Sequence, residues 1–406
     1  MYISKLHLKM GINEDSLELH KQKKGKLAVV SKVPVNTKLD LSLAYTPGVA
    51  EPCRRIAEDK RRIYDYTMKG NTVAIVSDGT AVLGLGDIGP EAALPVMEGK
   101  ALLMKEFADV DGFPICLTTK NVDEIVQAVQ WIAPVFGGIN LEDISAPRCF
   151  DVENRLKELL DIPVFHDDQH GTAIVTTAAV LNACKLAGKK MEELNVVVSG
   201  AGAAAISVSK MLMGVGMDKN KCNPVGNIIL CDSKGIVHEK RADLNPFKME
   251  MARITNKGKK EGSIADALVD ADVFIGLSVA GIVKPEMLKK MRKNPIILAM
   301  ANPIPEIMPD EAIKARPDAI IGTGRSDFPN QVNNVLAFPG IFRGAFDAKA
   351  TKITEGMKLA AAIALAEYVG TPTKEKFLTD PLDKKVALKV AEAVKKEAIA
   401  SGFIRK

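Results

Sequence analysis

The stretch NVVVSGAGAAA, residues 195–205, decides the fold that this sequence predicts. Its first five residues contain three consecutive valines, which are apolar and β-branched and predict a buried strand. The next six, Gly200-Ala201-Gly202-Ala203-Ala204-Ala205, fit the pattern G-x-G-x-x-G/A and open a helix over 203–212. The first glycine permits a tight turn, the second lets the backbone approach a pyrophosphate, and the third small residue lets helix and strand pack closely. We therefore expect a dinucleotide at this helix N-terminus rather than a purely structural turn.

The strand after the glycine turn ends at Asp232, further along the chain than the usual separation of about 20 residues. A loop over 215–227 accounts for the excess. An acidic side chain at this point hydrogen-bonds the adenine ribose and repels the 2′-phosphate of NADP, which favours NAD. Ser233 and Lys234 follow at once and are suited to accept that phosphate. The choice between NAD and NADP therefore stays open.

Strand-like and helix-like runs alternate on both sides of this motif. Strands are expected at 72–77, 113–118, 136–140, 162–165, 273–278, 296–302 and 319–324, with helices at 91–108, 122–132, 149–160 and 172–187. This order predicts an α/β protein of two lobes: an N-terminal α/β lobe (1–166) and a Rossmann-type doubly wound dinucleotide-binding domain (167–334). Helices at 348–370 and 384–401 belong to a segment, 335–406, that we expect to pack back on the first lobe.

Composition narrows the class of protein. The 406 residues carry 55 Lys and Arg against 50 Asp and Glu, a net charge of +5. The basic runs are short, scattered and free of interleaved aromatic residues, so we expect no nucleic-acid partner. The six cysteines form no CxxC pair, which is typical of a reducing compartment. No apolar run approaches the roughly 18 residues of a membrane span, and the start lacks the apolar region of a signal peptide, so we expect a cytoplasmic protein with no membrane partner.

The first 40 residues are basic and weakly patterned, and a helix over 16–24 is the most that they predict. Such a segment cannot build a core of its own. We therefore expect it to dock on a second copy of the chain, which makes the protein a dimer or a larger homo-oligomer.

Acidic residues gather where neighbouring strands end. Glu142-Asp143 lies in the loop after one strand, and Asp167-Asp168 follows the next strand directly. Because carboxyl ends of parallel strands meet at one edge of a sheet, these oxygens are placed to hold a hard divalent cation such as Mg²⁺ or Mn²⁺. The alternative is a set of helix caps and turn carboxylates. His166 and His170 are spaced like zinc ligands on a helix, but a strand precedes them and Asp167 stands where a zinc protease has Glu, so we expect them to brace the carboxylate loop.

Two further residues are candidates for proton transfer. Lys100 lies in the middle of an otherwise apolar helix, where a lysine either extends to the surface or points into a cleft with a tuned pKa. Tyr45 lies in the turn Ala44-Tyr45-Thr46-Pro47-Gly48. A tyrosine in a rigid Pro-Gly turn is either packed or placed for chemistry, and spacing alone decides neither case.

Together these motifs resemble the malic enzyme family. The matching segments are LAYTPGVA (43–50), SDG (77–79), LGLGD (83–87), GK (99–100), NLED (140–143), FHDDQHGT (165–172), ANP (301–303) and NNV (333–335). They occur in order from about residue 35 to 345, and the length is that of the family's short form. The resemblance implies oxidative decarboxylation of L-malate to pyruvate and CO₂, with NAD or NADP and Mg²⁺ or Mn²⁺.

The resemblance also implies a role for each matched residue. Tyr45 would be the general acid and Lys100 the general base, with Asp167 paired to Lys100. Glu142, Asp143 and Asp168 would bind the metal. Asn302 and Asn334 would contact the substrate or the nicotinamide end of the cofactor.

One position departs from the pattern of the larger family members. They have an arginine after Asp-Gly-Glu that grips a malate carboxylate, whereas Ala81 stands in that place here. Short-form members share the departure, and the anchor for the distal carboxylate is unassigned. Four rival functions stay open: a malolactic enzyme, a plain 2-hydroxy-acid or amino-acid dehydrogenase, a zinc hydrolase that uses the two histidines, and a nucleotide-sensing regulator without turnover.

Overall fold

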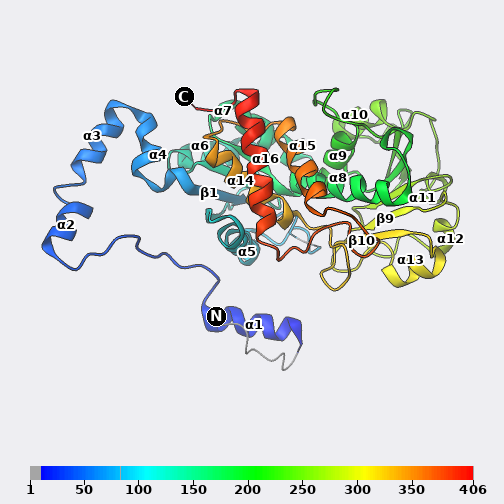
Figure 1. Ribbon diagram of the computed structural model, residues 1–406, viewed down its shortest axis with the longest axis horizontal. Helices are drawn as coiled ribbons and strands as arrows, with labels where there is room; N and C mark the ends of the chain where they lie inside the picture. Colours follow the sequence, from blue (N-terminus) through cyan, green and yellow to red (C-terminus); the bar gives the residue numbers. More distant parts are fainter. Residues whose placement is uncertain (1–10, 83, 406) are drawn as a thin grey trace.

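The computed structural model describes residues 11–82 and 84–405. Within these residues the chain forms two lobes, each built on a mainly parallel sheet, and an arm that precedes the first lobe (Figure 1). The α/β class with a Rossmann-type second lobe is therefore confirmed. No helix in the described part of the chain has the length and apolar character needed to cross a membrane.

The first sheet has the strand order β2-β1-β3-β4, with all pairs parallel. Its strands are β1 (Thr72–Ser77), β2 (Asp111–Cys116), β3 (Gly138–Leu141) and β4 (Val164–His166). The strands β1, β3 and β4 are buried along their whole length, as their continuous apolar runs predict for a sheet covered on both faces. The helices α5 (Pro90–Ala108), α6 (Val122–Ile132) and α7 (Arg148–Leu159) connect them.

The second sheet has the order β10-β9-β8-β5-β6-β7, with β7 antiparallel at the edge. Its strands are β5 (Asn195–Ser199), β6 (Asn227–Asp232), β7 (Gly235–Ile236), β8 (Val273–Gly276), β9 (Ile296–Ala299) and β10 (Ile320–Thr323). Its helices are α9 (Ala203–Leu212), α10 (Pro246–Ile254), α11 (Ile264–Ala267), α12 (Pro285–Leu288) and α13 (Pro309–Ala315). The strand order reverses between β5 and β8, and ligands of such sheets bind at the carboxyl ends of the strands beside that point.

A single helix, α8 (Asp167–Ala187), joins the two sheets. The sequence predicts this helix over 172–187, and the structure begins it five residues earlier, directly after β4. Asp167 and Asp168 therefore occupy its first turn, where free N–H groups favour carboxylates. Their backbone is fixed by a helix instead of a loop.

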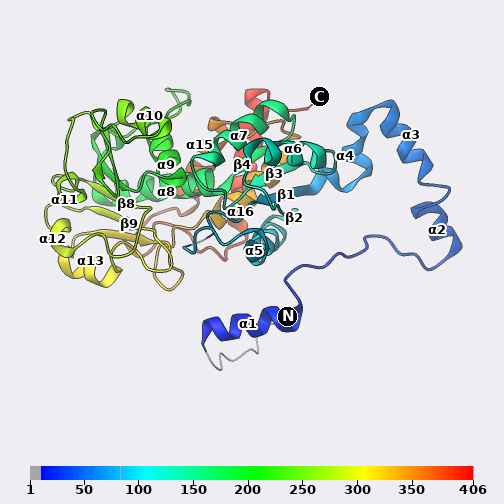
Figure 2. The same ribbon diagram turned by 180° about the vertical axis from the view of Figure 1, so that it is seen from behind.

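After β10 the chain returns to the first lobe through α14 (Phe338–Asp347), α15 (Glu355–Tyr368) and α16 (Lys385–Ser401). Figure 1 shows α14 and α16 in front of the first sheet, and Figure 2 shows α6 and α7 on its other side. Phe342 of α14 packs edge-on against Phe165 of β4, with ring centroids 6.0 Å apart. The expected return of the C-terminal helices to the first lobe is confirmed. The single helix predicted over 348–370 is shorter in the structure: α14 ends before it, and Lys349, with a φ of +53°, turns the chain toward α15, which begins at Glu355.

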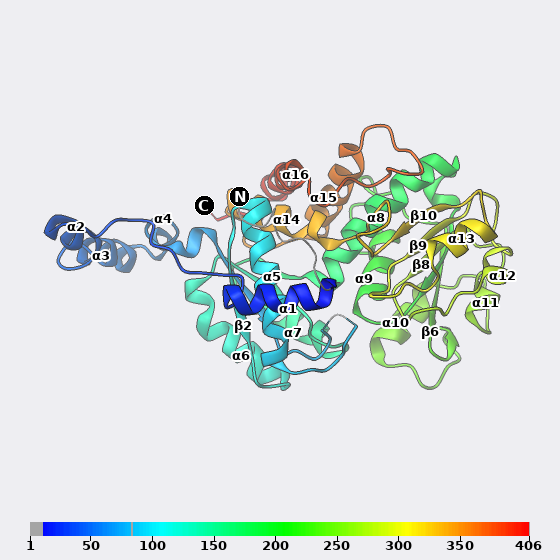
Figure 3. The ribbon, with the colours of Figure 1, turned by 90° about the horizontal axis from the view of Figure 1, so that it is seen from below.

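The arm, residues 11–66, holds α1 (Ile12–Lys23), α2 (Lys38–Ala44), α3 (Ala50–Glu58) and α4 (Ile63–Tyr66). None of these four helices contains a buried residue. Figures 1 and 2 show α2 and α3 away from the body and α1 below α5, which it overlaps only in the projection of Figure 3; the segment after α1 touches α5. There the amine of Lys26 donates to the carbonyl of Pro95 at 2.8 Å. The sequence reading missed α2, although Thr37 and Asp40 form the capping box that marks its start.

Short 3₁₀ turns complete the secondary structure: η1 (Lys60–Arg62), η2 (Met68–Asn71), η3 (Ala133–Val135), η4 (Met191–Glu193) and η5 (Asn334–Leu336). The last of these contributes to the site described next.

Candidate active site

Lys100 lies at the centre of a buried charged cluster. Its amine contacts the carboxylate of Asp167 and lies 3.0 Å from Oε1 of Glu142. The Lys100 side chain is 11% exposed, and those of Glu142 and Asp167 are 3% and 0% exposed. The amine also lies 4.5 Å from the ring centroid of Phe338 in α14. Of the two orientations that the sequence leaves open for Lys100, the structure has the one that faces the carboxylates.

Glu142, Asp143 and Asp168 bring three carboxylates together at the carboxyl edge of the first sheet. One oxygen of each lies within 4.8 Å of the others. The backbone N–H of Asp143 donates to Asp168 at 2.8 Å, which ties the loop after β3 to the first turn of α8. Hard divalent cations such as Mg²⁺ and Mn²⁺ take oxygen ligands of this kind, so the donor set fits one.

Burial and charge shift the proton equilibria of this cluster. Burial raises the pKa of Asp167, and Lys100 only partly offsets it. Burial and the neighbouring Asp168 likewise raise the pKa of Glu142. Burial alone would lower the pKa of Lys100, but the carboxylates of Asp167, Glu142 and Asp168 outweigh it and raise that pKa. The cluster therefore holds excess negative charge in a dry setting, which a dication would relieve.

Gly171 makes the close packing around Asp167 possible. A Cβ at this position would lie 1.8 Å from Oδ1 of Asp167 and 3.1 Å from Cβ of Asn334. Any side chain there would displace the carboxylate. The glycine thus lets η5 approach α8 and places Asn334 beside Asp167.

Asn302 lies in the loop after β9, at the junction of the two lobes. It is exposed. A Cβ on Gly84 of the first lobe would lie 2.7 Å from the carbonyl oxygen of Asn302, so the loops of the two lobes meet here. The side-chain nitrogen of Asn302 lies beside the second lobe, 2.8 Å from where a Cβ on Gly324 would be, and no described contact joins Asn302 to the Lys100 cluster.

Tyr45 is not part of the cluster within one chain. It ends α2 in the arm, its side chain is 66% exposed, and Figure 1 shows α2 far from α5, the helix that carries Lys100. The expectation that Tyr45 and Lys100 meet around one ion is wrong for a single chain. The physical reason is that α2 and α3 do not pack against the body of the same chain, since neither helix contains a buried residue.

Arg148 is a structural residue of the site that sequence reasoning missed. Its guanidinium lies 2.9 Å from Oδ2 of the buried Asp78 and donates to Thr80 at 3.0 Å. It also donates to Ser145 and to the carbonyl of Lys120. These contacts fix the loop that contains Ala81, whose backbone N–H donates to the carbonyl of Asp143. With its guanidinium so occupied, Arg148 braces the loop and does not replace the arginine that is absent at Ala81.

The glycine turn opens onto the largest of the described cavities, of about 830 Å³. Gly200 has a φ of +118°, and a Cβ there would lie 2.5 Å from the carbonyl oxygen of Leu277, so glycine is required. Gly202 ends the turn, and its carbonyl begins α9 by accepting from Ile206 at 3.0 Å. Ala203 and Ala204 follow as the first residues of α9, and Ala205 is buried against the sheet. The cavity lies at the switch point, where a dinucleotide is expected.

Asp232 lines this cavity, but its carboxylate is already occupied. Arg241 donates to both oxygens at 2.8 and 3.0 Å, Lys248 donates to Oδ2 at 2.8 Å, and the N–H of Lys234 donates to Oδ1 at 3.0 Å. Burial opposes ionisation, but these donors outweigh it and lower the pKa to about 2. An ionised carboxylate offers about four acceptor positions, so a ribose contact would require Arg241 or Lys248 to move.

Of the two histidines that the sequence predicts as braces of the carboxylate loop, only His170 uses its ring for polar contacts, whereas the buried His166 ring has no hydrogen-bond partner among the described residues. Glu153 of α7 is buried and accepts from His170 Nε2 at 2.8 Å and from the backbone N–H of His166 at 3.2 Å. The other ring nitrogen of His170 lies 3.1 Å from the amine of Lys358 in α15 and 3.2 Å from Ser207 in α9. Burial lowers the pKa of His170 to about 4. His170 thus joins both lobes and the C-terminal helices, and His166 is 0% exposed.

A buried amine among carboxylates, beside a Rossmann-type domain with a dinucleotide turn, defines a class of protein: a two-lobed nicotinamide-dependent oxidoreductase. Comparison with known proteins narrows the class. The family model described as "Malic enzyme, N-terminal domain" matches residues 24–157, and the one described as "Malic enzyme, NAD binding domain" matches residues 169–399. The chain belongs to the malic enzyme family and is an NAD- or NADP-dependent enzyme.

Three relatives illustrate the similarity. A protein of Bacillus subtilis (strain 168) named bifunctional malic/malolactic enzyme is 57% identical over 98% of this chain and 95% of its own. An NADP-dependent malic enzyme of Rhizobium meliloti (strain 1021) is 47% identical over 97% of this chain and 53% of its own. The crystal structure of an NAD-dependent malic enzyme from Thermotoga maritima superposes with a TM-score of 0.89 at 50% identity, over 94% of this chain and 99% of that one.

Proposed function

We propose that this protein converts L-malate into pyruvate and CO₂, reduces NAD or NADP, and requires Mg²⁺ or Mn²⁺ at Glu142, Asp143 and Asp168. The observation that carries the proposal is the contact of the Lys100 amine with Asp167 and Glu142, beside three clustered carboxylates. When bound, the ion would supply Lewis-acid polarisation of the substrate's C2 oxygen and stabilise negative charge as CO₂ leaves. NAD or NADP would supply the hydride acceptor.

The residues of this chain then have separate tasks. Asp167 holds the Lys100 amine in position, and Lys100 takes the C2 hydroxyl proton at Nζ. It keeps its own proton while three carboxylates face it, so it acts as a base only after their charge is neutralised. Asn334 beside Asp167 and Asn302 at the lobe junction contact the substrate or the nicotinamide end. Tyr45 protonates C3 of the product enolate through its phenol.

Tyr45 can serve that role only from a second copy of the chain. The arm exposes a series of apolar side chains that its own body leaves uncovered: Leu39 at 67%, Leu41 at 50%, Leu43 at 69% and Tyr45 at 66%. Burying them on another copy would gain the hydrophobic free energy that a single chain forgoes. We propose a dimer in which each arm delivers Tyr45 to the partner's cluster.

Mixing two inactive variants tests this arrangement. Tyr45→Phe and Lys100→Ala are each expected to lose malate decarboxylation. Unfolded and refolded together, half of the dimers combine one chain of each kind and hold one intact site, so about a quarter of the wild-type activity should return. Each variant refolded alone is the control. No recovery in the mixture, with dimers present in sedimentation, would place Tyr45 outside the partner's site.

The cofactor cavity admits NADP as well as NAD. Arg241 and Lys248 neutralise Asp232, which removes the repulsion that an isolated carboxylate would exert on a 2′-phosphate. Lys234, with its side chain 67% exposed, lies at the cavity wall beside Ser233. Lys234→Ala should therefore raise KM for NADP more than KM for NAD, in assays with the two cofactors in parallel.

One assay tests the reaction as a whole: turnover of malate with NAD and with NADP, with and without Mn²⁺, following CO₂ and the reduced cofactor together. The proposal expects both products in equal amounts and only with metal. Reduced cofactor without CO₂ would indicate a plain dehydrogenase. Cofactor binding without turnover of malate would indicate a nucleotide sensor.

A malolactic reaction is the second candidate, because the relative from Bacillus subtilis is named a bifunctional malic/malolactic enzyme. In that case CO₂ and lactate would appear without accumulation of reduced cofactor. Measuring lactate and pyruvate in the same assay separates the two reactions.

A further inference from the structure

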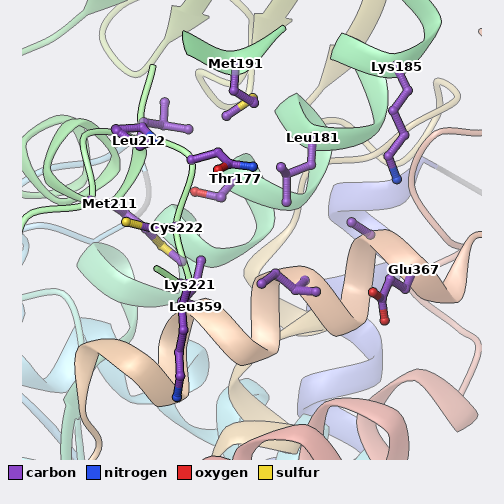
Figure 4. Close-up of a pocket in the computed structure, with 15 residues that line it drawn as sticks. Thr177, Leu181, Lys185, Met191, Met211, Leu212, Lys221, Cys222, Leu359 and Glu367 are labelled. Atoms are coloured by element: carbon purple, nitrogen blue, oxygen red, sulfur yellow. The ribbon is translucent and has the colours of Figure 1, made fainter. Parts of the chain in front are cut away.

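The dinucleotide cavity differs from a smaller pocket between α8 and α15 in what lies behind its wall. The smaller pocket has a volume of about 200 Å³, and Figure 4 shows Leu181 of α8 and Leu359 of α15 among the side chains around it. All of its charged lining residues are exposed: Lys185, Lys221 and Glu367. The wall of the dinucleotide cavity includes Ser278, which contacts the carboxylate of Glu306. The larger cavity therefore has a buried acidic group directly behind its wall.

Glu306 lies in the loop after β9 and is 0% exposed. Its Oε1 accepts from the backbone N–H of Ser278 at 2.8 Å, and its Oε2 accepts from the backbone N–H of Ala301 at 3.0 Å. A Cβ on Gly276 would lie 2.3 Å from the carboxyl carbon, so the glycine at the end of β8 makes room for this group. No cation of the described chain pairs with it. Both oxygens thus face donors, which is the arrangement that an ionised carboxylate requires.

These contacts tie together the carboxyl ends of three strands. Ser278 follows β8, and its hydroxyl lies 2.7 Å from that of Ser199, which ends β5 directly before the glycine turn. Ala301 follows β9 and precedes Asn302. The backbone adds a further link, because the N–H of Val283 donates to the carbonyl of Glu306 at 3.1 Å. Glu306 therefore fixes the loops after β8 and β9 relative to the glycine turn.

The fold indicates which part of the cofactor lies over these loops. A dinucleotide crosses the point where the strand order reverses, with its pyrophosphate at the glycine turn. Asp232, at the end of β6, marks the side of the adenine ribose. The nicotinamide half then lies on the opposite side, over the ends of β8 and β9, where Glu306 holds both loops.

We propose that the charge of Glu306 makes this site favour the oxidised cofactor over the reduced one. The nicotinamide ring is cationic when oxidised and neutral when reduced, so a buried carboxylate nearby stabilises the oxidised form alone. Burial raises the pKa of Glu306, and a cationic ring would oppose that rise. Because its carboxylate is fully covered, Glu306 acts as a positioning residue, through its charge and the loops that it fixes, without touching the ring. The inference deepens the proposed function but rests on cofactor binding alone, and not on the conversion of malate.

Glu306→Gln keeps the shape of the side chain and removes its charge. The ratio of Kd for NADH to Kd for NAD⁺ should fall about tenfold in this variant, chiefly because NAD⁺ binds more weakly. Calorimetric titration of the full chain, without malate or metal, measures both constants. If the protein binds NADP more tightly, NADP⁺ and NADPH are the probes. Glu311→Gln, an exposed change in α13, is the matched control and should leave the ratio unchanged.

ADP-ribose, which lacks the nicotinamide ring, separates this effect from a structural one. Its Kd should stay within about twofold of the wild-type value in Glu306→Gln. Glu306→Asp retains the charge and should retain the wild-type ratio, even where both affinities fall.

Equal weakening of NAD⁺, NADH and ADP-ribose, with a constant ratio, would overturn the proposal and leave Glu306 a purely structural role. In the wild-type protein, NADH bound more than about tenfold tighter than NAD⁺ would also overturn it, even if Glu306→Gln did not fold. Since no malate is present, failure of the proposed decarboxylation would leave these constants unaffected.

Discussion

The Lys100 cluster and the arm differ in how far one chain completes them. Lys100, Glu142, Asp167 and Asp168 are held by helix and strand ends, and the amine and two of the carboxylates are nearly or fully buried. The arm has four helices and no buried residue in any of them. The proposed proton abstraction and metal binding therefore need residues of one chain only, whereas the proposed final protonation depends on a surface that a single chain leaves bare.

The largest effect is expected at the centre of the cluster. Lys100→Ala should lower kcat by about 10³, within the range for loss of a general base, while leaving cofactor binding intact. Steady-state kinetics at saturating malate and Mn²⁺ measures it. Lys105→Ala, an exposed lysine on the same helix, should change little. A near-normal kcat in Lys100→Ala would refute the proposed role of Lys100 as the general base.

A second test concerns the metal set. Asp168→Ala should raise the Mn²⁺ concentration for half-maximal activity by at least about 100-fold, since it removes a ligand and also the acceptor for the Asp143 N–H. A Mn²⁺ titration measures the shift. Asp151→Ala, an exposed acid on α7, is the control. An unchanged metal requirement would exclude Asp168 from the ligand set.

The proposed contribution of the arm to activity should depend on protein concentration, whereas the contacts within the Lys100 cluster should not. Leu41→Asp combined with Leu43→Asp should lower activity about tenfold at low protein concentration, with recovery as concentration rises, because assembly follows mass action. Sedimentation of the same samples should show monomers. Lys38→Ala in the same helix keeps the apolar face and should remain dimeric. A doubly substituted protein that is monomeric and fully active would refute the role of the arm.

The support beneath the cluster predicts a smaller effect, on stability. Glu153→Gln keeps the shape but weakens the contacts to His170 and to the His166 N–H, at a cost of about 2 kcal/mol. Urea unfolding measures this loss. Glu158→Gln, on the exposed side of α7, should cost almost nothing.

The smallest effect is expected in acid, in the dinucleotide domain. The folded protein holds the pKa of Asp232 near 2, below its usual 3.8, so its contribution is present above pH 4 and is lost as pH falls from about 4 to 2. Arg241→Gln removes the main donor. Its acid-unfolding midpoint should rise by a few tenths of a pH unit, with no change in stability difference above pH 5. A constant difference at all pH values would assign the effect to packing.

The sequence predicts those parts of the molecule that local rules decide. Gly200 to Ala205 follow a strand and open a helix, so their pattern alone places the dinucleotide turn. Glu142, Asp143, Asp167 and Asp168 follow strand ends, and parallel strands bring such ends to one edge. Lys100 was undecided because helix periodicity does not say which neighbour covers a polar residue.

The rest depends on contacts that no local pattern contains. Arg241 and Lys248 follow β7 in the chain and donate to the carboxylate of Asp232. The pattern of the strand that ends at Asp232 therefore does not predict that this carboxylate already has hydrogen-bond partners. Arg148 pairs with Asp78, although the elements α5, β2, α6 and β3 separate the two residues along the chain. Tyr45 is exposed on the arm, apart from Lys100, and in our proposal only a second copy of the chain brings the two residues together.

The helix α8 carries Asp167 and Asp168 in its first turn, packs on α9 and α15 further along, and runs without a break for 21 residues, about 30 Å. Such a rod transmits rotation but does not bend. If the cofactor-binding half tilts during turnover, the acidic first turn must tilt with it, and the loops that meet at Gly84 and Asn302 must slide past each other. Opening and closing would then re-aim the carboxylates at each cycle instead of leaving them as a static platform.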